Sequence, residues 1–377
     1  MLQREDLPPA LNLSKRTTTA MQGSDVIIHN RQTNADTSGE SMTPSFEASE
    51  ELSRDRQAAP AKKVQGATNS SLNCERSIFH EAWWLDIASG GQWALASVEE
   101  SGAIVGEMPY FLAKNGLWSA CINPPLTRTL GPLIIDSGQA ANAEFQHRVS
   151  VTTKLIEQLP KVDRFFQVFD PQIKDAVAFS LHGYSVSLGF TFRISCDQTC
   201  EEAWRHIRKY TRNLIDKAQR ELTVTTIASI DEFLNFYNAN LSDRKQQNAY
   251  GNGVMRNLVT AFVNRNAGTL IGAYSNEGVL VAALGLVWDA RTMYYLLTTR
   301  SQNAHSGAIS LLVWNAIKIA IQRKLVLDLD GIATPTIYRF LASFGGSLDQ
   351  RLEAEKMTTS YCLARTLHRR LRSRGAL

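Results

Sequence analysis

The sequence predicts an α/β fold (of the α+β type) with two tandem modules, each a mixed, mostly antiparallel sheet flanked by helices. The strongest observation is residues 267–347, which are expected to form strand, strand, strand, helix, strand and helix in that order. A similar order is expected over residues 77–192, although the two stretches share no visible sequence repeat. Residues 1–74 are polar, with Phe46 as their only aromatic residue. They predict a disordered leader, because they cannot bury enough apolar surface to offset chain entropy.

The composition is that of a soluble globular protein with room for two domains: 377 residues, 44% hydrophobic and 20% charged. A formal net charge of +4 gives no general argument for nucleic-acid binding. No apolar run approaches the roughly 20 residues of a membrane span, and no apolar signal segment precedes the modules, so we expect a cytoplasmic protein. The five cysteines include one close pair, Cys196 and Cys200, without a histidine cluster. Reduced thiols are therefore expected, and no metal.

The first module is predicted to span residues 75–197. Apolar spacing over residues 78–86 predicts one or two helical turns. The prolines between residues 122 and 132 exclude a helix there, because proline lacks a backbone donor and favours extended neighbours. The other elements, in chain order, are strands 93–98, 103–112 and 117–120, helix 140–159, strand 165–169, helix 172–182 and strand 185–192.

The second module is predicted to span residues 198–358 and to begin with a basic helix over residues 201–222. One face of this helix is apolar at three- and four-residue spacing. Its arginines and lysines either are solvated or face an anionic ligand. The elements that follow are strand 223–227, helices 230–241 and 253–264, strands 268–275, 279–289 and 292–299, a helix from residue 306, strand 325–329, helix 335–344 and strand 348–356.

Two local signals fix the end of this module. Thr334 followed by Pro335 is an N-cap with proline at the first helical position, and Gly345-Gly346 ends the same helix. The chain then closes with a basic helix over residues 359–377. We expect this helix to dock through a stripe of leucines at every fourth position, Leu363, Leu367 and Leu371.

The order of elements in the second module resembles the core of the GNAT acyltransferase fold. The segments Asp328-Leu329-Asp330-Gly331 and Phe344-Gly345-Gly346, with Phe340 between them, resemble a signature of FemAB-like acyltransferases. Trp83-Trp84-Leu85-Asp86 and Leu130-Gly131-Pro132 resemble the N-terminal module of that family. The resemblance implies two GNAT-like modules in one chain.

In the GNAT fold, the third and fourth core strands diverge and the acyl donor lies between them. The resemblance therefore places a donor between strands 292–299 and 325–329, with its phosphates at the N-terminus of the following helix. The residues that correspond to the family's phosphate loop are His305, Ser306, Gly307 and Ala308, after Gln302. His305 stands where the family has its first glycine. Arg300 is a further candidate for a phosphate or carboxylate, the alternative being a surface charge at a turn.

Two carboxylates, Asp328 and Asp330, are candidate catalytic groups. They lie two residues apart at the C-terminal end of a strand and should share one face. One of them could act as a general base toward an amine or hydroxyl. In the alternative, Asp328 pairs with an arginine and Asp330 holds the turn at Gly331. The family resemblance adds Arg244 and Arg212 as substrate-binding candidates. A covalent nucleophile is not required, since holding amine and thioester together supplies much of the acceleration.

We therefore expect an acyltransferase (EC 2.3 class) that moves an acyl group from acyl-CoA to an amine or hydroxyl of a sugar or cell-envelope/polysaccharide precursor. Aminoacyl-tRNA is the less favoured donor, because the sequence lacks the long helical hairpin with which relatives bind tRNA. The alternative is a non-catalytic GNAT-fold binding or scaffold protein in polysaccharide assembly, which His305 supports. The expected partner is a small-molecule or glycan-precursor acceptor, with no DNA. Contact of the C-terminal helix with an acidic membrane surface is a secondary hypothesis, and the sequence predicts no oligomeric state.

Overall fold

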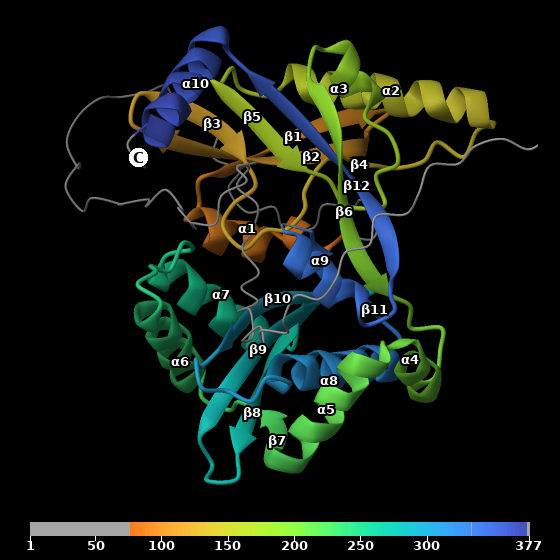
Figure 1. Cartoon of the computed structure of the whole chain (residues 1–377). Helices are drawn as coiled ribbons and strands as arrows, with labels where there is room; N and C mark the ends of the chain where they lie inside the picture. Colours follow the sequence, from red (N-terminus) through yellow and green to blue (C-terminus); the bar gives the residue numbers. More distant parts are fainter. Residues whose placement is uncertain (1–75, 333, 375–377) are drawn as a thin grey trace, which may run out of the picture.

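The computed structural model describes residues 76–332 and 334–374 (Figure 1). The predicted leader, residues 1–74, lies outside the described residues. A single sheet of 12 strands runs through the described part of the chain. Its strand order is β1-β2-β3-β5-β12-β6-β11-β10-β9-β8-β7, and β4 pairs with β2 beside this path. Helices cover the sheet in both halves of the molecule (Figure 1).

The first module contains the elements that the sequence predicts, with shifted ends, and one short strand that it does not predict, β4. They are η1 (Ile78–His80), α1 (Ala82–Ser89), β1 (Trp93–Glu100), β2 (Ala103–Asn115), β3 (Trp118–Ile122), β4 (Leu133–Ile134), α2 (Ala141–Glu157), β5 (Arg164–Val168), α3 (Val177–Leu181) and β6 (Ser185–Ile194). The predicted helix 172–182 is wrong over its first half. Asp170 ends the strand by accepting a hydrogen bond from the backbone N–H of Gln172, so the helix begins only at Val177.

The second module follows the predicted order closely. Its elements are α4 (Cys200–His206), α5 (Lys209–Glu221), β7 (Leu222–Thr226), α6 (Ile230–Asp243), α7 (Asn252–Asn264), β8 (Gly268–Ser275), β9 (Leu280–Trp288), β10 (Thr292–Arg300), α8 (Ala308–Arg323), β11 (Val326–Gly331), α9 (Pro335–Ala342) and β12 (Ser347–Met357). The chain then continues into α10 (Thr359–Arg374).

The two modules repeat one order of elements, which confirms the predicted fold class. Each has three antiparallel strands, then a helix, a strand parallel to the third, a short helix and a final antiparallel strand. The parallel pairs are β3 with β5 in the first module and β10 with β11 in the second.

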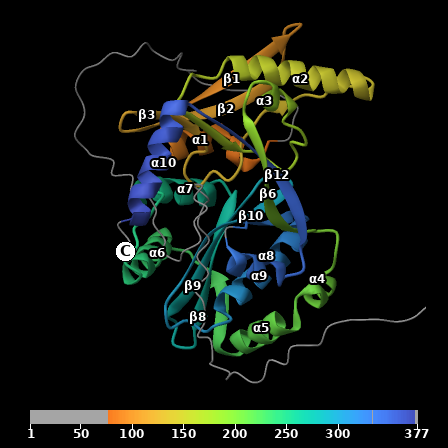
Figure 2. The ribbon, with the colours of Figure 1, turned by 45° about the horizontal axis from the view of Figure 1, so that its top comes forward.

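The last strands of the two modules are exchanged. β12 lies between β5 and β6, and β6 lies between β12 and β11. Each module thus inserts its final strand into the sheet of the other, and Figures 1 and 2 both show β6 and β12 side by side where the two halves meet. The sheet is therefore continuous from one module to the other, although the sequence predicts a boundary between them at residues 197 and 198. The division into residues 75–197 and 198–358 stays a prediction.

The first helical segment of the chain packs into the second module rather than only its own. Phe79 and Trp84 are fully buried in a cluster with residues of α6, α7 and β10. The Phe79 ring lies 4.7 Å from the ring of Tyr294, centroid to centroid. Figure 1 shows α1 between the two halves of the molecule. This burial, together with the exchanged strands, fixes the modules against each other.

The basic helix predicted over residues 201–222 is two helices, α4 and α5. Ile207 is extended (φ −66°, ψ 135°) and buried, and the backbone N–H of Arg208 donates to the carbonyl of Ser343 at 2.8 Å. A tertiary hydrogen bond and a buried side chain therefore override helix propensity at this point.

The prediction that α10 docks through its leucines is wrong for the residues described. Leu363 and Leu367 are 61% and 59% exposed. The helix contacts the sheet through other side chains: the Tyr361 ring packs on Trp118 at 5.4 Å, and Arg365 pairs with Glu355. Within the described ranges, no helix has the length and apolar character needed to span a membrane.

Candidate functional site

The candidate site lies where β10 and β11 separate. These parallel strands pair only at their beginnings, through Thr292–Val326, Met293–Leu327 and Tyr294–Asp328. β10 then continues to Arg300, and its register against β9 shifts between Tyr295 and Leu297. A bulge of this kind bends the strand locally. The pairing of the two strands therefore ends at Tyr294 and Asp328. We call the interval between the strands beyond this point the gap, and the point where they part the apex.

Arg128 of the first module occupies the apex. Its side chain is 2% exposed. Its Nη2 donates to the carbonyl of Leu296 on β10 at 2.6 Å, and its Nη1 lies 2.8 Å from Oδ2 of Asp330 on β11. One guanidinium thus joins both strands just beyond their last paired residues. A charge this deeply buried is stable only with such partners.

Asp330 is held by two arginines. Besides Arg128, Arg351 on β12 places Nη1 3.2 Å from Oδ1 of Asp330. Burial raises the pKa of Asp330, but the charges of Arg128 and Arg351 outweigh burial and hold it below its usual range. The backbone of Asp330 has φ 71°, and the register of β11 against β6 shifts between Asp328 and Gly331. This irregular backbone aims the Asp330 carboxylate at the gap.

Asp328 faces the exchanged strand β6 rather than the gap. Its Oδ2 accepts from Nε of Arg193 at 2.9 Å, and its Oδ1 accepts from the hydroxyl of Thr191 at 2.6 Å and from the backbone N–H of Asp330 at 2.9 Å. The two aspartates lie in one buried network but have different arginine partners. Their contacts are those of the alternative in which Asp328 pairs with an arginine and Asp330 shapes the turn. A role as general base stays a prediction for both.

The loop before α8 satisfies part of its own helix N-terminus. Nδ1 of His305 accepts from the backbone N–H of Gly307 at 3.0 Å, and the carbonyl of His305 accepts from Ala308 N–H at 2.9 Å. A Cβ added to Gly307 would overlap the carbonyl oxygen of Leu214 on α5. Ser306 is exposed. Histidine at the first glycine position therefore takes up an amide that the family pattern offers to phosphate, and Gly307 has a packing role.

Arg244 and Arg300 lie close together in the structure. The sequence analysis predicts that Arg244 binds the acceptor and that Arg300 binds a phosphate of the donor. Nη2 of Arg244 donates to the carbonyl of Arg300 at 2.8 Å, and Nε2 of Gln302 donates to the carbonyl of Asp243 at 3.3 Å. The loop after α6 thus lies at the open end of the gap. Arg212 is directed elsewhere, because its Nη1 donates to the carbonyls of Trp204 and Arg205 at the end of α4.

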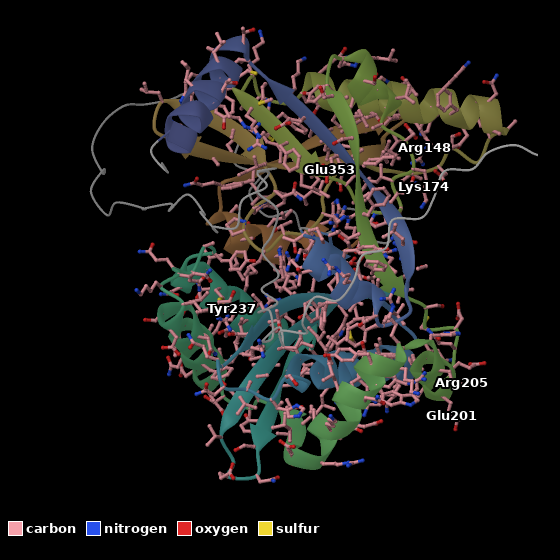
Figure 3. All side chains as sticks on the ribbon, viewed as in Figure 1. Arg148, Lys174, Glu201, Arg205, Tyr237 and Glu353 are labelled. Atoms are coloured by element: carbon pink, nitrogen blue, oxygen red, sulfur yellow. The ribbon has the colours of Figure 1, made fainter. Side chains whose placement is uncertain are left out.

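Tyr237 of α6 is a further buried polar residue near Arg128 and Arg244. It is buried, and Arg128 and Arg244 both act electrostatically on its phenol. Burial nevertheless raises its pKa, so the hydroxyl stays protonated and can donate a hydrogen bond. Figure 3 shows Tyr237 between α6 and the strands β9 and β10. Among the described residues, no group of three or more histidine, cysteine, aspartate or glutamate side chains could hold a metal ion.

Sequence reasoning missed Arg128, Tyr237 and Arg351. Arg128 lies between residues that carry the family resemblance, Leu126-Thr127 and Leu130-Gly131-Pro132. Arg128 is the only charged residue in the proline-rich segment 122–132, and this is the signal that could have found it. Nothing in the sequence shows that this loop reaches into the other module.

Comparisons with known proteins agree with this geometry. Residues 202–335 match the family model described as an acetyltransferase (GNAT) domain. The solved structure of FemX is similar over 76% of this chain and 93% of its own, with 12% identity and a TM-score of 0.56.

Two further solved structures are less similar, each with a TM-score of 0.48. They are the C-terminal domain of a putative lysylphosphatidylglycerol synthetase from Agrobacterium fabrum (11% identity, 75% of this chain and 89% of that one) and L-PGS from Bacillus licheniformis (12% identity, 76% and 91%). No curated protein matches the sequence. Residues 202–335 thus match a GNAT domain, and the described chain shares the fold of FemX.

Proposed function

We propose that this protein transfers an acyl group from acyl-CoA to an amine or hydroxyl of a sugar or cell-envelope/polysaccharide precursor. The observation that carries the proposal is the partial pairing of β10 and β11, which part after Tyr294 and Asp328. Unpaired backbone groups along the diverging strands can bind a pantetheine-like arm. The acceptor class follows from the FemAB-like resemblance.

In this proposal the nucleotide end of the donor lies near Arg300 and Ser306, and the acyl end points to the apex. The acceptor nitrogen or oxygen attacks the thioester carbon, the bond to sulfur breaks, and CoA leaves as a thiol or thiolate. The proton lost by the acceptor goes to solvent or to a carboxylate of the site. Positioning supplies most of the acceleration, because the charges of Arg128 and Arg351 lower the pKa of Asp330 and so weaken it as a base.

One observation favours the second candidate, a non-catalytic scaffold. His305 already accepts the Gly307 amide, so this helix N-terminus offers fewer donors to a pyrophosphate than the family pattern does. The two candidates differ in whether CoA binds at all.

Calorimetry with CoA and acetyl-CoA tests the proposal, with two glutamate variants of α8 and its preceding loop. Ser306→Glu places a negative charge at the exposed N-terminal end, and Gln322→Glu is the matched control near the C-terminal end. We expect Ser306→Glu to weaken CoA binding at least about tenfold, since a repelled phosphate loses a charge-assisted contact. Gln322→Glu should bind like wild type. Absence of binding to the wild-type protein would favour the scaffold.

A further inference from the structure

The gap between β10 and β11 holds more positive than negative charge. Three arginines, Arg128, Arg351 and Arg244, lie along it, and two of them share the single carboxylate of Asp330. Arg244 has a backbone carbonyl as its hydrogen-bond acceptor and, within the part of the chain that the structure describes, no carboxylate within 4.0 Å. Asp328 does not offset this excess, because it pairs with Arg193.

Each of these three guanidinium groups also has a buried N–H group without a hydrogen-bond acceptor in the described part of the chain. Nε of Arg128, Nε of Arg244 and Nε of Arg351 are buried and lack a hydrogen-bond partner among the described residues. An unpaired buried donor on a charged group costs several kcal/mol unless an acceptor is supplied. An anion bound in the gap would supply acceptors for these N–H groups, which the single carboxylate of Asp330 does not satisfy.

We propose that the gap binds a carboxylate of the substrate at Arg128 of the apex, with Arg244 on the side of the open end. A guanidinium fork matches the two oxygens of a carboxylate. This inference rests on the proposed function, in which the phosphates lie at the open end near Ser306. The group that reaches Arg128 is then the far end of the acyl chain, or the part of the acceptor that meets it. The reacting group of the acceptor is still an amine or hydroxyl, but either the acyl chain or the acceptor must carry a carboxylate.

Two matched pairs of compounds locate that carboxylate. Succinyl-CoA and butyryl-CoA have four-carbon acyl chains with and without a terminal carboxylate, and calorimetry compares their affinities. Alanine and alaninamide are amine acceptors with and without a carboxylate. Their rates of acetylation are compared by measuring the release of the CoA thiol from acetyl-CoA. We expect at least about a tenfold preference for the carboxylate in one of the two pairs. Preference in the first pair assigns it to the acyl chain, and preference in the second assigns it to the acceptor.

Variants then connect the preference to these side chains. Arg244→Gln is expected to reduce it several-fold with little loss of stability, because Arg244 has no acidic partner. Arg128→Met should abolish the preference and Arg128→Lys should restore part of it; thermal melts confirm that each variant is folded. Arg256→Gln on the neighbouring helix α7, which is 49% exposed, is the control and should change nothing.

The possible outcomes distinguish a failure of the carboxylate site from a failure of the proposed acyltransferase function. Equal affinities and rates within both pairs, with CoA still bound, would overturn the carboxylate site and leave the acyltransferase proposal intact. A preference that survives both Arg128→Met and Arg244→Gln would overturn it as well. If CoA itself does not bind, both proposals fall together.

Discussion

Replacing Gly307 by alanine should destabilise the protein although the backbone at this position permits any residue. Gly307 has φ −91° and ψ 0°, a conformation open to L-residues, so no backbone strain is involved. The added Cβ would instead overlap the carbonyl of Leu214 and lie against Ala218, which forces α8 and α5 apart. Overpacking of this kind costs about 1–3 kcal/mol, and the reduced freedom of the unfolded chain returns about 0.4–1 kcal/mol. We expect a net loss of about 1–2 kcal/mol.

Thermal and denaturant unfolding followed by circular dichroism measure this loss. A change of 1–2 kcal/mol corresponds to a fall in Tm of roughly 1.5–3 °C, because an unfolding entropy of about 2.1 cal/mol/K per residue sums to about 0.6 kcal/mol/K over the described residues. Gly253→Ala in α7 is the matched control, because a Cβ there meets nothing within 4 Å. It should leave the stability unchanged or raise it by up to about 1 kcal/mol. If Gly307→Ala is as stable as wild type while it loses CoA binding, then Gly307 serves phosphate approach and the packing argument is wrong.

Three further variants test single side chains. Burial lowers the pKa of His80 to about 4, while the unfolded chain takes up the proton near pH ~6.5, so the unfolding free energy should fall by about 3 kcal/mol as the pH drops across that range. His80→Gln should lack this fall in denaturant titrations at several pH values. Asp328→Asn should cost up to about 3–5 kcal/mol by removing the closer and more buried of the two carboxylate partners of Arg193, with kcat of the folded fraction kept within tenfold. A hundredfold loss of kcat would instead support the base role. Arg212→Ala should lower stability by about 1 kcal/mol through the α4 carbonyls and leave KM unchanged, whereas a raised KM would support its predicted contact with substrate.

The order of elements could be predicted because it is local information. Alternating and three/four-spaced apolar residues place β8, β9, β10 and α8 within a few residues of their observed ends. The N-cap at Thr334 and proline at the next position also hold, since the Thr334 hydroxyl accepts from the N–H of Ile337. The breaks that sequence reasoning missed, at Ile207 and before Val177, are caused by contacts with residues far away in the chain or by a turn at a strand end.

The pairing of strands and the composition of the site are not local. β12 follows β11 in sequence by one short helix, yet β6 of the first module lies between them. Periodicity shows that each strand has a buried face but not which strand lies beside it. The candidate carboxylates were identified because strand ends are common sites, whereas Arg128 comes from a loop 168 residues before its acceptor, Leu296. Only the assembled sheet brings these groups together.

One loop accounts for the difference between the two modules at the equivalent position. In the first module, β3 and β5 also begin as a parallel pair. Leu130 then fills the space where they would part, because its N–H donates to Val168, its carbonyl accepts from Asp170, and it forms a parallel bridge with Phe169. The backbone of this loop thus closes the first gap, while Arg128, two residues earlier, reaches the second. The bridge that closes one module and the arginine that enters the other come from the same few residues. Within the described residues, the loop therefore closes the space between β3 and β5 and supplies the gap between β10 and β11 with its buried cation.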